Sequence, residues 1–165
     1  MKTITTFLAL CFFVTTSLAQ SKSDKLYDVF AGKEGVTNFS FSKNMIDAIN
    51  LDLGDDENER KVTGDLQQVR FLSYNPQKGD LSGPQFHKKA LALLPSNYKE
   101  YKDLDSGDSN TEIWLLGKRK KYSECHVFLT NQADNQMRFL VSFYGNFHVN
   151  DLKELKEAGK SFSDK

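Results

Sequence analysis

Apolar residues recur every three or four positions in some stretches of the chain and at every second position in others. The first spacing puts side chains on one face of a helix, and alternation puts them on one face of a strand. Counting the capping residues, the sequence predicts helices over residues 23–31, 42–51, 82–94 and 150–158. It predicts strands over residues 36–41, 69–74, 98–104, 111–116, 122–130 and 137–143.

The third helix has the clearest signals. Ser82 can cap it, Pro84 lies in its first turn, Phe86 and Ala90 share one face, and Pro95 ends it. Ser23 can cap the first helix in the same way, and Asn150 the last.

Two earlier elements are expected to contribute to the core. Phe39 and Phe41 lie on one side of the first strand, which predicts a half-buried strand. Met45, Ile46 and Ile49 are expected to face the core from the second helix.

The last four strands follow one another through turns rich in Asp, Ser, Gly and Asn, which predicts up-and-down hairpins. Residues 113–116 and 139–141 are apolar on both faces of their strands, so helices should cover part of both faces of the sheet. The predicted fold class is α+β: a single domain with a largely antiparallel sheet of five to six strands and three to five helices packed on it.

Residues 1–19 have the organisation of a secretory signal peptide. Lys2 gives the positive start, residues 4–14 are apolar, and Ser17-Leu18-Ala19 is a small-x-small cleavage site. The apolar run is about half of the roughly 20 residues that span a bilayer. Cys11 is not expected to carry a lipid, because Leu10 stands where a lipoprotein signal has a small residue. We expect an exported protein without a membrane span, in the periplasm or outside the cell, whose single domain occupies residues 20–165.

Charge and cysteine content narrow the classes of partner. The whole chain has 22 basic and 22 acidic residues, and loss of Lys2 leaves a net charge of −1, so no nucleic-acid partner is expected. The basic run 118–121 is typical of a solvated turn. Without Cys11, Cys125 is the single thiol, which excludes an internal disulfide. Cys125 alternates with Ser123 and Val127, so we expect it to be buried on an apolar face.

No motif predicts a metal, a cofactor or a catalytic residue. His87, His126 and His148 lack the short spacings of zinc ligands. Residues 103–112 resemble a calcium loop, but Trp114 occupies the twelfth position, where a bidentate Glu is required. Neither a Gly-x-Ser-x-Gly motif nor a glycine-rich phosphate loop is present in the sequence.

Aromatic residues gather in the strand-rich half of the chain. Strands favour aromatic residues, but such rings also supply rigid contact area in binding surfaces. We therefore take four of them as a candidate binding face: Tyr98, Tyr101, Trp114 and Tyr144.

Several segments together resemble a known family. They are Lys-Leu-Tyr-Asp-Val-Phe at 25–30, Gly-Val-Thr at 35–37, Ser-Lys-Asn-Met at 42–45, Leu-Val-Ser-Phe-Tyr-Gly-Asn-Phe at 140–147 and Asp-Leu at 151–152. From residue 24 to about 158 the chain resembles the domain-of-unknown-function family 4252 (DUF4252), small exported proteins of Bacteroidetes. It departs from the family pattern at Tyr-Ser-Glu-Cys, 122–125. The resemblance implies no catalytic residues and suggests a link to envelope sensing or stress response.

Two functions remain open at this point. The first is a non-catalytic envelope protein that binds an envelope protein or a small ligand through its sheet-rich half. The alternative is a hydrolase-type enzyme, which would require a cleft where His87, His126 or His148 meets an acid within hydrogen-bond reach.

Overall fold

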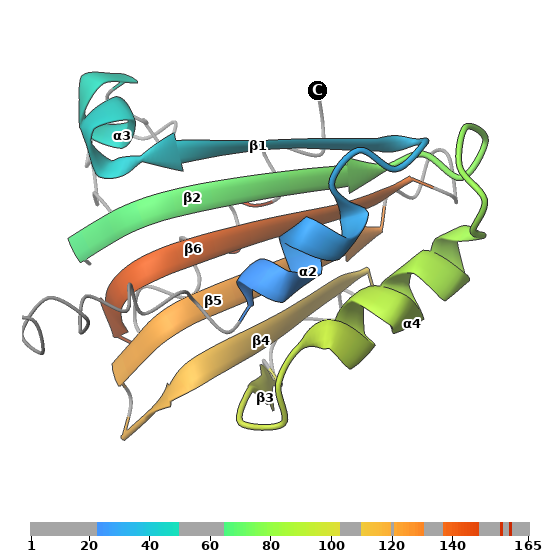
Figure 1. Ribbon diagram of the computed structural model, residues 1–165. Coiled ribbons are helices and arrows are strands. Elements are labelled where there is room, and N and C mark those ends of the chain that lie inside the picture. The colour runs from blue at the N-terminus through green and yellow to red at the C-terminus, as the bar shows by residue number, and fades with distance from the viewer. Residues whose placement is uncertain are drawn as a thin grey trace, which may run out of the picture.

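Six strands form one antiparallel sheet in the order β1-β2-β6-β5-β4-β3 (Figure 1). The computed structural model describes residues 23–49, 65–102, 110–119, 121–130, 137–148, 156 and 159. The strands are β1 (Val36–Ser42), β2 (Asp65–Tyr74), β3 (Lys99–Tyr101), β4 (Thr111–Lys118), β5 (Lys121–Thr130) and β6 (Arg138–His148). The expected antiparallel sheet is confirmed.

Three helices accompany the sheet in the described part of the chain: α2 (Asp24–Phe30), α3 (Lys43–Ile49) and α4 (Gly83–Leu93). α2 and α4 lie across the same face of the sheet (Figure 1). Lys156 is also helical, within the region where the last helix was predicted, and Gly159, one residue beyond the predicted end, is helical as well. The described residues thus contain more sheet than the α+β expectation suggested, with helices at the low end of the expected number.

α4 begins as the sequence predicted. The Ser82 hydroxyl accepts a hydrogen bond from the Gln85 amide over 3.4 Å, and the Ser82 amide donates to Oε1 of Gln85 over 2.8 Å. This capping box satisfies two amides at the start of the helix. Phe86 and Ala90 are buried against the sheet.

The order of the strands combines local and distant pairings. β3, β4, β5 and β6 pair in sequence, so the predicted hairpin order is confirmed. β2, however, pairs with β6, with Phe71 opposite Val141. The chain leaves β2, the second strand from one edge of the sheet, passes through α4 and returns as β3 at the opposite edge (Figure 1).

The two faces of the sheet differ in chemistry. The face under α2 and α4 holds an apolar cluster that includes Leu26, Leu72 and Phe128. The opposite face is apolar, and Val127 lies in its core; Ile46 of α3 packs there. At Gly159 a Cβ atom would lie 3.2 Å from the Val127 side chain, so this helical residue also contacts the apolar face.

Cys125 belongs to the apolar face and is fully buried, as predicted. Burial raises the pKa of its thiol far above the ordinary value, because the thiolate would be poorly solvated. The neighbouring side chain of His126 points to the other face. Cys125 is therefore a core residue.

Two predicted core residues are more exposed than expected. Phe39 is 41% exposed and Met45 is 46% exposed. β1 is an edge strand of the described sheet, so none of the described strands covers the outer side of the Phe39 ring. In α3 it is Ile46 that turns into the core.

Gly35 holds the start of β1 close to the segment that follows β2. Its φ angle is +75°, which favours glycine, and its carbonyl accepts a hydrogen bond from the Asn75 amide over 2.8 Å. A Cβ atom at this position would lie 2.6 Å from the Asn75 carbonyl oxygen and 2.9 Å from the Gly79 amide nitrogen. Only glycine fits this approach.

Several predicted segments fall outside the described residues. They are the signal peptide at 1–19, most of the calcium-like turn at 103–112, and most of the last helix at 150–158. Within the described residues, none of the helices has the length and apolar character needed to cross a membrane.

Candidate functional site

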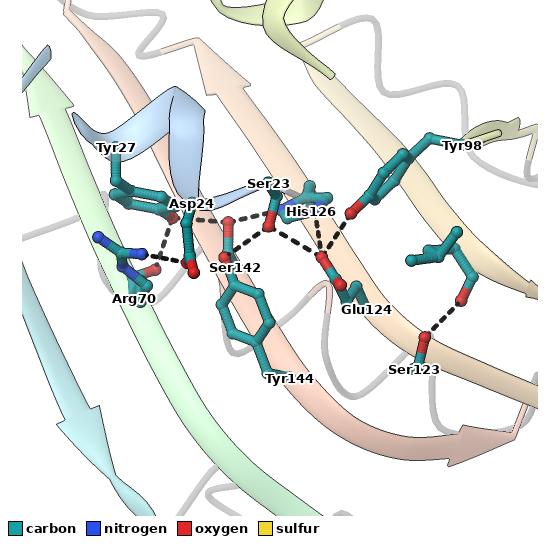
Figure 2. Close-up of polar contacts among 11 residues, drawn as sticks. Ser23, Asp24, Tyr27, Arg70, Tyr98, Ser123, Glu124, His126, Ser142 and Tyr144 are labelled. Carbon is teal, nitrogen blue, oxygen red and sulfur yellow. Dashed lines mark hydrogen bonds and ion pairs between the residues drawn. The ribbon is translucent and has the colours of Figure 1, made fainter. Parts of the chain in front are cut away.

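A polar network lies between α2 and the sheet (Figure 2). We call this set the α2 network; its members are Ser23, Asp24, Tyr27, Arg70, Tyr98, Glu124, His126, Ser142 and Tyr144. The strand register explains how these residues come together, because Arg70 of β2 lies opposite Ser142 of β6, and Ser142 lies opposite His126 of β5. Opposed residues in neighbouring strands point to the same face.

Glu124 is the acceptor at one end of the α2 network. Its Oε2 accepts hydrogen bonds from the Ser23 hydroxyl over 2.8 Å and from the Tyr98 hydroxyl over 2.5 Å. The Ser23 oxygen lies 2.9 Å from the Tyr144 hydroxyl. Since the Ser23 hydrogen points at Glu124, Tyr144 is the donor in this last bond. Two hydroxyl groups thus donate to the carboxylate of Glu124, a third is linked to it through Ser23, and the residue is only 8% exposed.

His126 is completely buried beside this carboxylate. Tyr27 donates to Oγ of Ser142 over 2.6 Å, and Ser142 lies 2.6 Å from Nδ1 of His126. Because Nε2 faces the Glu124 carboxylate, the tautomer that suits both neighbours carries its proton on Nε2 and accepts the Ser142 hydrogen at Nδ1. Nε2 lies 3.5 Å from Oε2 of Glu124, too far for a normal hydrogen bond, and it has no hydrogen-bond partner among the described residues.

Burial sets the protonation states in the α2 network. It lowers the pKa of His126, and the nearby Glu124 opposes this shift without cancelling it, so the imidazole is neutral. Desolvation likewise raises the pKa of Tyr27 and of Tyr98 far above their ordinary values, and that of Tyr144 to about 12. All three phenols are therefore hydrogen-bond donors at neutral pH.

The other end of the α2 network joins α2 to β2. Nη1 of Arg70 donates to Oδ1 of Asp24 over 2.6 Å, and the Arg70 guanidinium lies 3.9 Å from the centre of the Tyr27 ring. A guanidinium stacked on an aromatic ring and paired with a carboxylate is held in one orientation. The first turn of α2 is thereby fixed to the sheet.

Ser142, His126 and Glu124 have the composition of a hydrolytic triad but not its accessibility. Ser142 and His126 are both 0% exposed. The serine contacts Nδ1 and the acid lies beside Nε2, the reverse of the usual arrangement in serine proteases. Because the Ser142 hydroxyl is held between Tyr27 and His126, a substrate cannot reach it. The α2 network fastens a helix.

A second polar group lies nearer the solvent, between α4 and β4. We call it the Trp114 surface, made of His87, Glu112 and Trp114. Nε2 of His87 lies 3.1 Å from Oε1 of Glu112, and Nε1 of Trp114 donates to Oε2 of Glu112 over 3.4 Å. The side chains of His87 and Glu112 are 23% and 40% exposed. Trp114 is half-buried and packs on the apolar cluster beneath α4.

The four aromatic residues of the predicted binding face do not form one surface. Tyr98 and Tyr144 are 5% and 8% exposed, because their hydroxyl groups turn inward to the α2 network. Tyr101 is half-buried and packs against the opposite face of the sheet. Trp114 alone of the four combines partial exposure with a polar contact on the helix-covered face.

Sequence reasoning missed the role of Ser23, Glu124 and Ser142. Ser23 was expected to cap α2, but its side chain makes no capping hydrogen bond and instead contacts Glu124. One signal was available. Glu124 and His126 share a face of one predicted strand, while Ser142 and Tyr144 share a face of the next.

Across the described ranges, the acidic, His and Cys side chains do not gather in any group of three that could hold a metal ion. No curated protein and no solved structure is significantly similar to this chain. The family described as Domain of unknown function (DUF4252) matches residues 27–155, which covers most of the sequence and all three strands that carry the α2 network. The chain therefore belongs to the DUF4252 family.

Proposed function

We propose that this chain is an exported, non-catalytic protein that binds an envelope protein or a small ligand at the Trp114 surface. The observation that carries the proposal is the position of Trp114. Its ring is half-buried, and its indole nitrogen donates to Glu112, whose carboxylate also contacts His87. An aromatic face, a carboxylate and an imidazole are thus presented together.

The Trp114 surface is held rigid before any ligand arrives. Trp114 lies within β4, opposite His126 on β5, and it packs on the apolar cluster that also holds Phe128. The His87 ring meets the Phe128 ring edge-on, with the centroids 5.3 Å apart. Side chains that are already ordered lose little conformational entropy on binding, which favours affinity. Tryptophan is also enriched among residues that dominate binding energy.

A non-catalytic role is supported by the chemistry of the α2 network. Its serine, histidine and carboxylate are buried, and the serine hydroxyl is engaged by Tyr27 and His126. A nucleophile must reach the substrate to act. These groups stabilise the fold, and the partly exposed residues at the Trp114 surface are left for binding.

Export is supported by the N-terminal segment. Cleavage after Ala19 would remove the positively charged start and the apolar run, yet Ser23 and every other residue of the α2 network would remain. The processed chain would therefore keep the contacts that fix α2. A link to envelope sensing or stress response would follow if the partner is itself an envelope component.

Trp114 is the only tryptophan of the chain, so its fluorescence reports on this surface directly. A photo-crosslinking amino acid at position 87 should yield a discrete adduct in the native envelope, and the same group at position 101, on the opposite face, should not. The adduct should disappear when Trp114→Ala is added. The purified partner should then shift the emission of Trp114. Equal crosslinking from both positions, or none from position 87, would contradict the proposal.

The alternative, a hydrolase-type enzyme, has one observation in its favour. His87 and Glu112 meet at 3.1 Å in a partly exposed position, and such a pair can transfer protons. Purified protein should be assayed with chromogenic esters and glycosides beside His87→Gln and Glu112→Gln. Turnover that both variants abolish would establish the enzyme. Absence of turnover in the wild type, together with the position-87 adduct, favours binding.

A further inference from the structure

The two edges of the sheet are built differently. β3 has three residues, of which Lys99 and Glu100 are charged. β1 has seven residues, Val-Thr-Asn-Phe-Ser-Phe-Ser, with neither a charge nor a proline. Its register with β2 runs without a bulge from Val36 to Ser42. Natural edge strands are usually short, charged, bulged or interrupted by proline, because a regular edge attracts another strand.

Exposed apolar side chains lie at the same edge. Phe39 and Met45, on β1 and the adjoining α3, are the large hydrophobic side chains that are exposed in the described residues. The Phe39 ring stacks on Phe71 with centroids 4.7 Å apart, and meets Phe41 edge-on at 5.3 Å. The apolar face of the sheet therefore extends through Phe39 and Phe41 to its outer edge.

We propose that β1 pairs with β1 of a second copy of this chain, antiparallel and around a two-fold axis at Ser40. In this register Phe39 lies opposite Phe41 of the second copy, and Phe41 lies opposite its Phe39. Asn38 lies opposite Ser42 of the second copy on the other face. Residues that oppose each other across an antiparallel pair share a face, so apolar meets apolar and polar meets polar.

A second copy fits this edge because the strand complements itself. No charge lies on β1, so two copies meet without like-charge repulsion. The phenylalanines stand symmetrically on either side of Ser40, which is what an isologous interface requires. Pairing would satisfy the outer backbone groups of β1, bury Phe39 and join the two six-stranded sheets into one continuous sheet.

Sedimentation of the purified protein tests the association. The expected result is a concentration-dependent species of twice the chain mass. Phe39→Lys should be a monomer, because it places a charge opposite an apolar ring, and Phe39→Leu should still form the dimer. Circular dichroism of both variants checks that the fold is intact. A wild type that stays monomeric up to about 1 mM, a concentration at which even weak specific pairs form, would overturn the proposal.

Cysteine crosslinking tests the register independently of Phe39. Ser40→Cys puts two thiols opposite each other across the axis, about 5 Å apart between Cβ atoms. Mild oxidation should give a disulfide-linked dimer. Asn38→Cys is the matched control, since its two copies would lie about 14 Å apart along the strands. Wild type, with Cys125 buried, should not crosslink. Crosslinking of Asn38→Cys in preference to Ser40→Cys would overturn the proposed pairing.

Discussion

The Ser23 hydroxyl donates a hydrogen bond to Oε2 of Glu124 over 2.8 Å, although the two residues lie 101 positions apart in the chain. This contact joins the start of α2 to the middle of the sheet. Tyr98 donates to the same oxygen from the segment before β3. One buried carboxylate therefore holds together parts of the chain that local structure does not connect.

Glu124→Gln should destabilise the protein by about 1–3 kcal/mol, because the amide is a weaker acceptor and buries an NH₂ group beside hydroxyl donors. Urea unfolding followed by circular dichroism measures this loss. Hydrogen exchange over residues 24–30 should also become faster, since α2 loses its anchor. Glu112→Gln is the control, because its side chain is 40% exposed and its effect should be smaller. Equal losses in the two variants would contradict the role given to Glu124.

Tyr27→Phe should cost about 1 kcal/mol, which is typical of one lost hydrogen bond in a buried chain. The phenol donates to Ser142, and Ser142 in turn contacts Nδ1 of His126. Thermal and urea unfolding provide the measurement. Tyr101→Phe, on the opposite face, should be nearly neutral. An unchanged stability in Tyr27→Phe would mean that the Ser142 hydroxyl is satisfied without it.

The stability of the protein should depend on pH through His126. Burial lowers the pKa of His126 in the folded state below the ordinary value of 6.5, so the unfolded chain takes up the proton first as the pH falls. The contribution of His126 to the free energy of unfolding should therefore be fully present above about pH 6.5. Below that pH it should decrease, by at most about 1.4 kcal/mol per pH unit. The loss stops once the pH has fallen through the lowered pKa.

The measurement for this pH effect is the difference between wild type and His126→Gln in urea unfolding from pH 5 to 8. Carboxyl groups contribute to both proteins, so only the difference isolates the imidazole. A His126→Gln slope equal to that of wild type would contradict a neutral, buried imidazole.

Cys125 should not react with Ellman's reagent while the protein is folded. The residue is 0% exposed, so the reagent cannot reach its thiol. Burial also raises the pKa of the thiol, so the reactive thiolate does not form. In 6 M guanidinium the same thiol should react at the rate of a free cysteine. The measurement is the ratio of the two rates. A rapid reaction in the folded state would place Cys125 at the surface.

Gly35→Ala should destabilise the protein by roughly 1–3 kcal/mol, since a side chain is strained at positive φ and here meets backbone atoms at 2.6 and 2.9 Å. Gly32→Ala is a matched control: its φ is also positive, but no atom lies within 4 Å of an added Cβ. The difference between the two variants in thermal unfolding isolates the close approach from the backbone strain. Equal shifts would show that the contact with Asn75 is unimportant.

Local patterns predicted the elements well, and they could not predict the site. Ser82 and Pro84 specify the start of α4 through groups adjacent in sequence, so the sequence reveals it. Alternation placed Cys125 correctly, because the register of a strand with one apolar face is strongly determined. Ser23 offers the opposite case. A serine before a helix favours a cap, but the Ser23 oxygen accepts from the Tyr144 hydroxyl and its hydrogen goes to Glu124.

The same limit applies to the aromatic residues. Tyrosine has an apolar ring and a polar hydroxyl, so sequence alone does not tell whether Tyr98 and Tyr144 face solvent or a buried polar partner. The partner is Glu124, directly for Tyr98 and through Ser23 for Tyr144. Their burial follows from the pairing of β5 with β6 and from the position of α2. Both are long-range features.

The pairing of β2 with β6 constrains the order in which the protein can fold. Phe71 and Val141 are 70 residues apart in the chain, yet they face each other across this ladder. Until β6 has been synthesised, β2 has no second neighbour, and β1 and β2 form only an isolated two-stranded pair, which is marginally stable in water. The sheet therefore cannot close before almost the whole sequence is available, because β6 supplies the second neighbour of both β2 and β5.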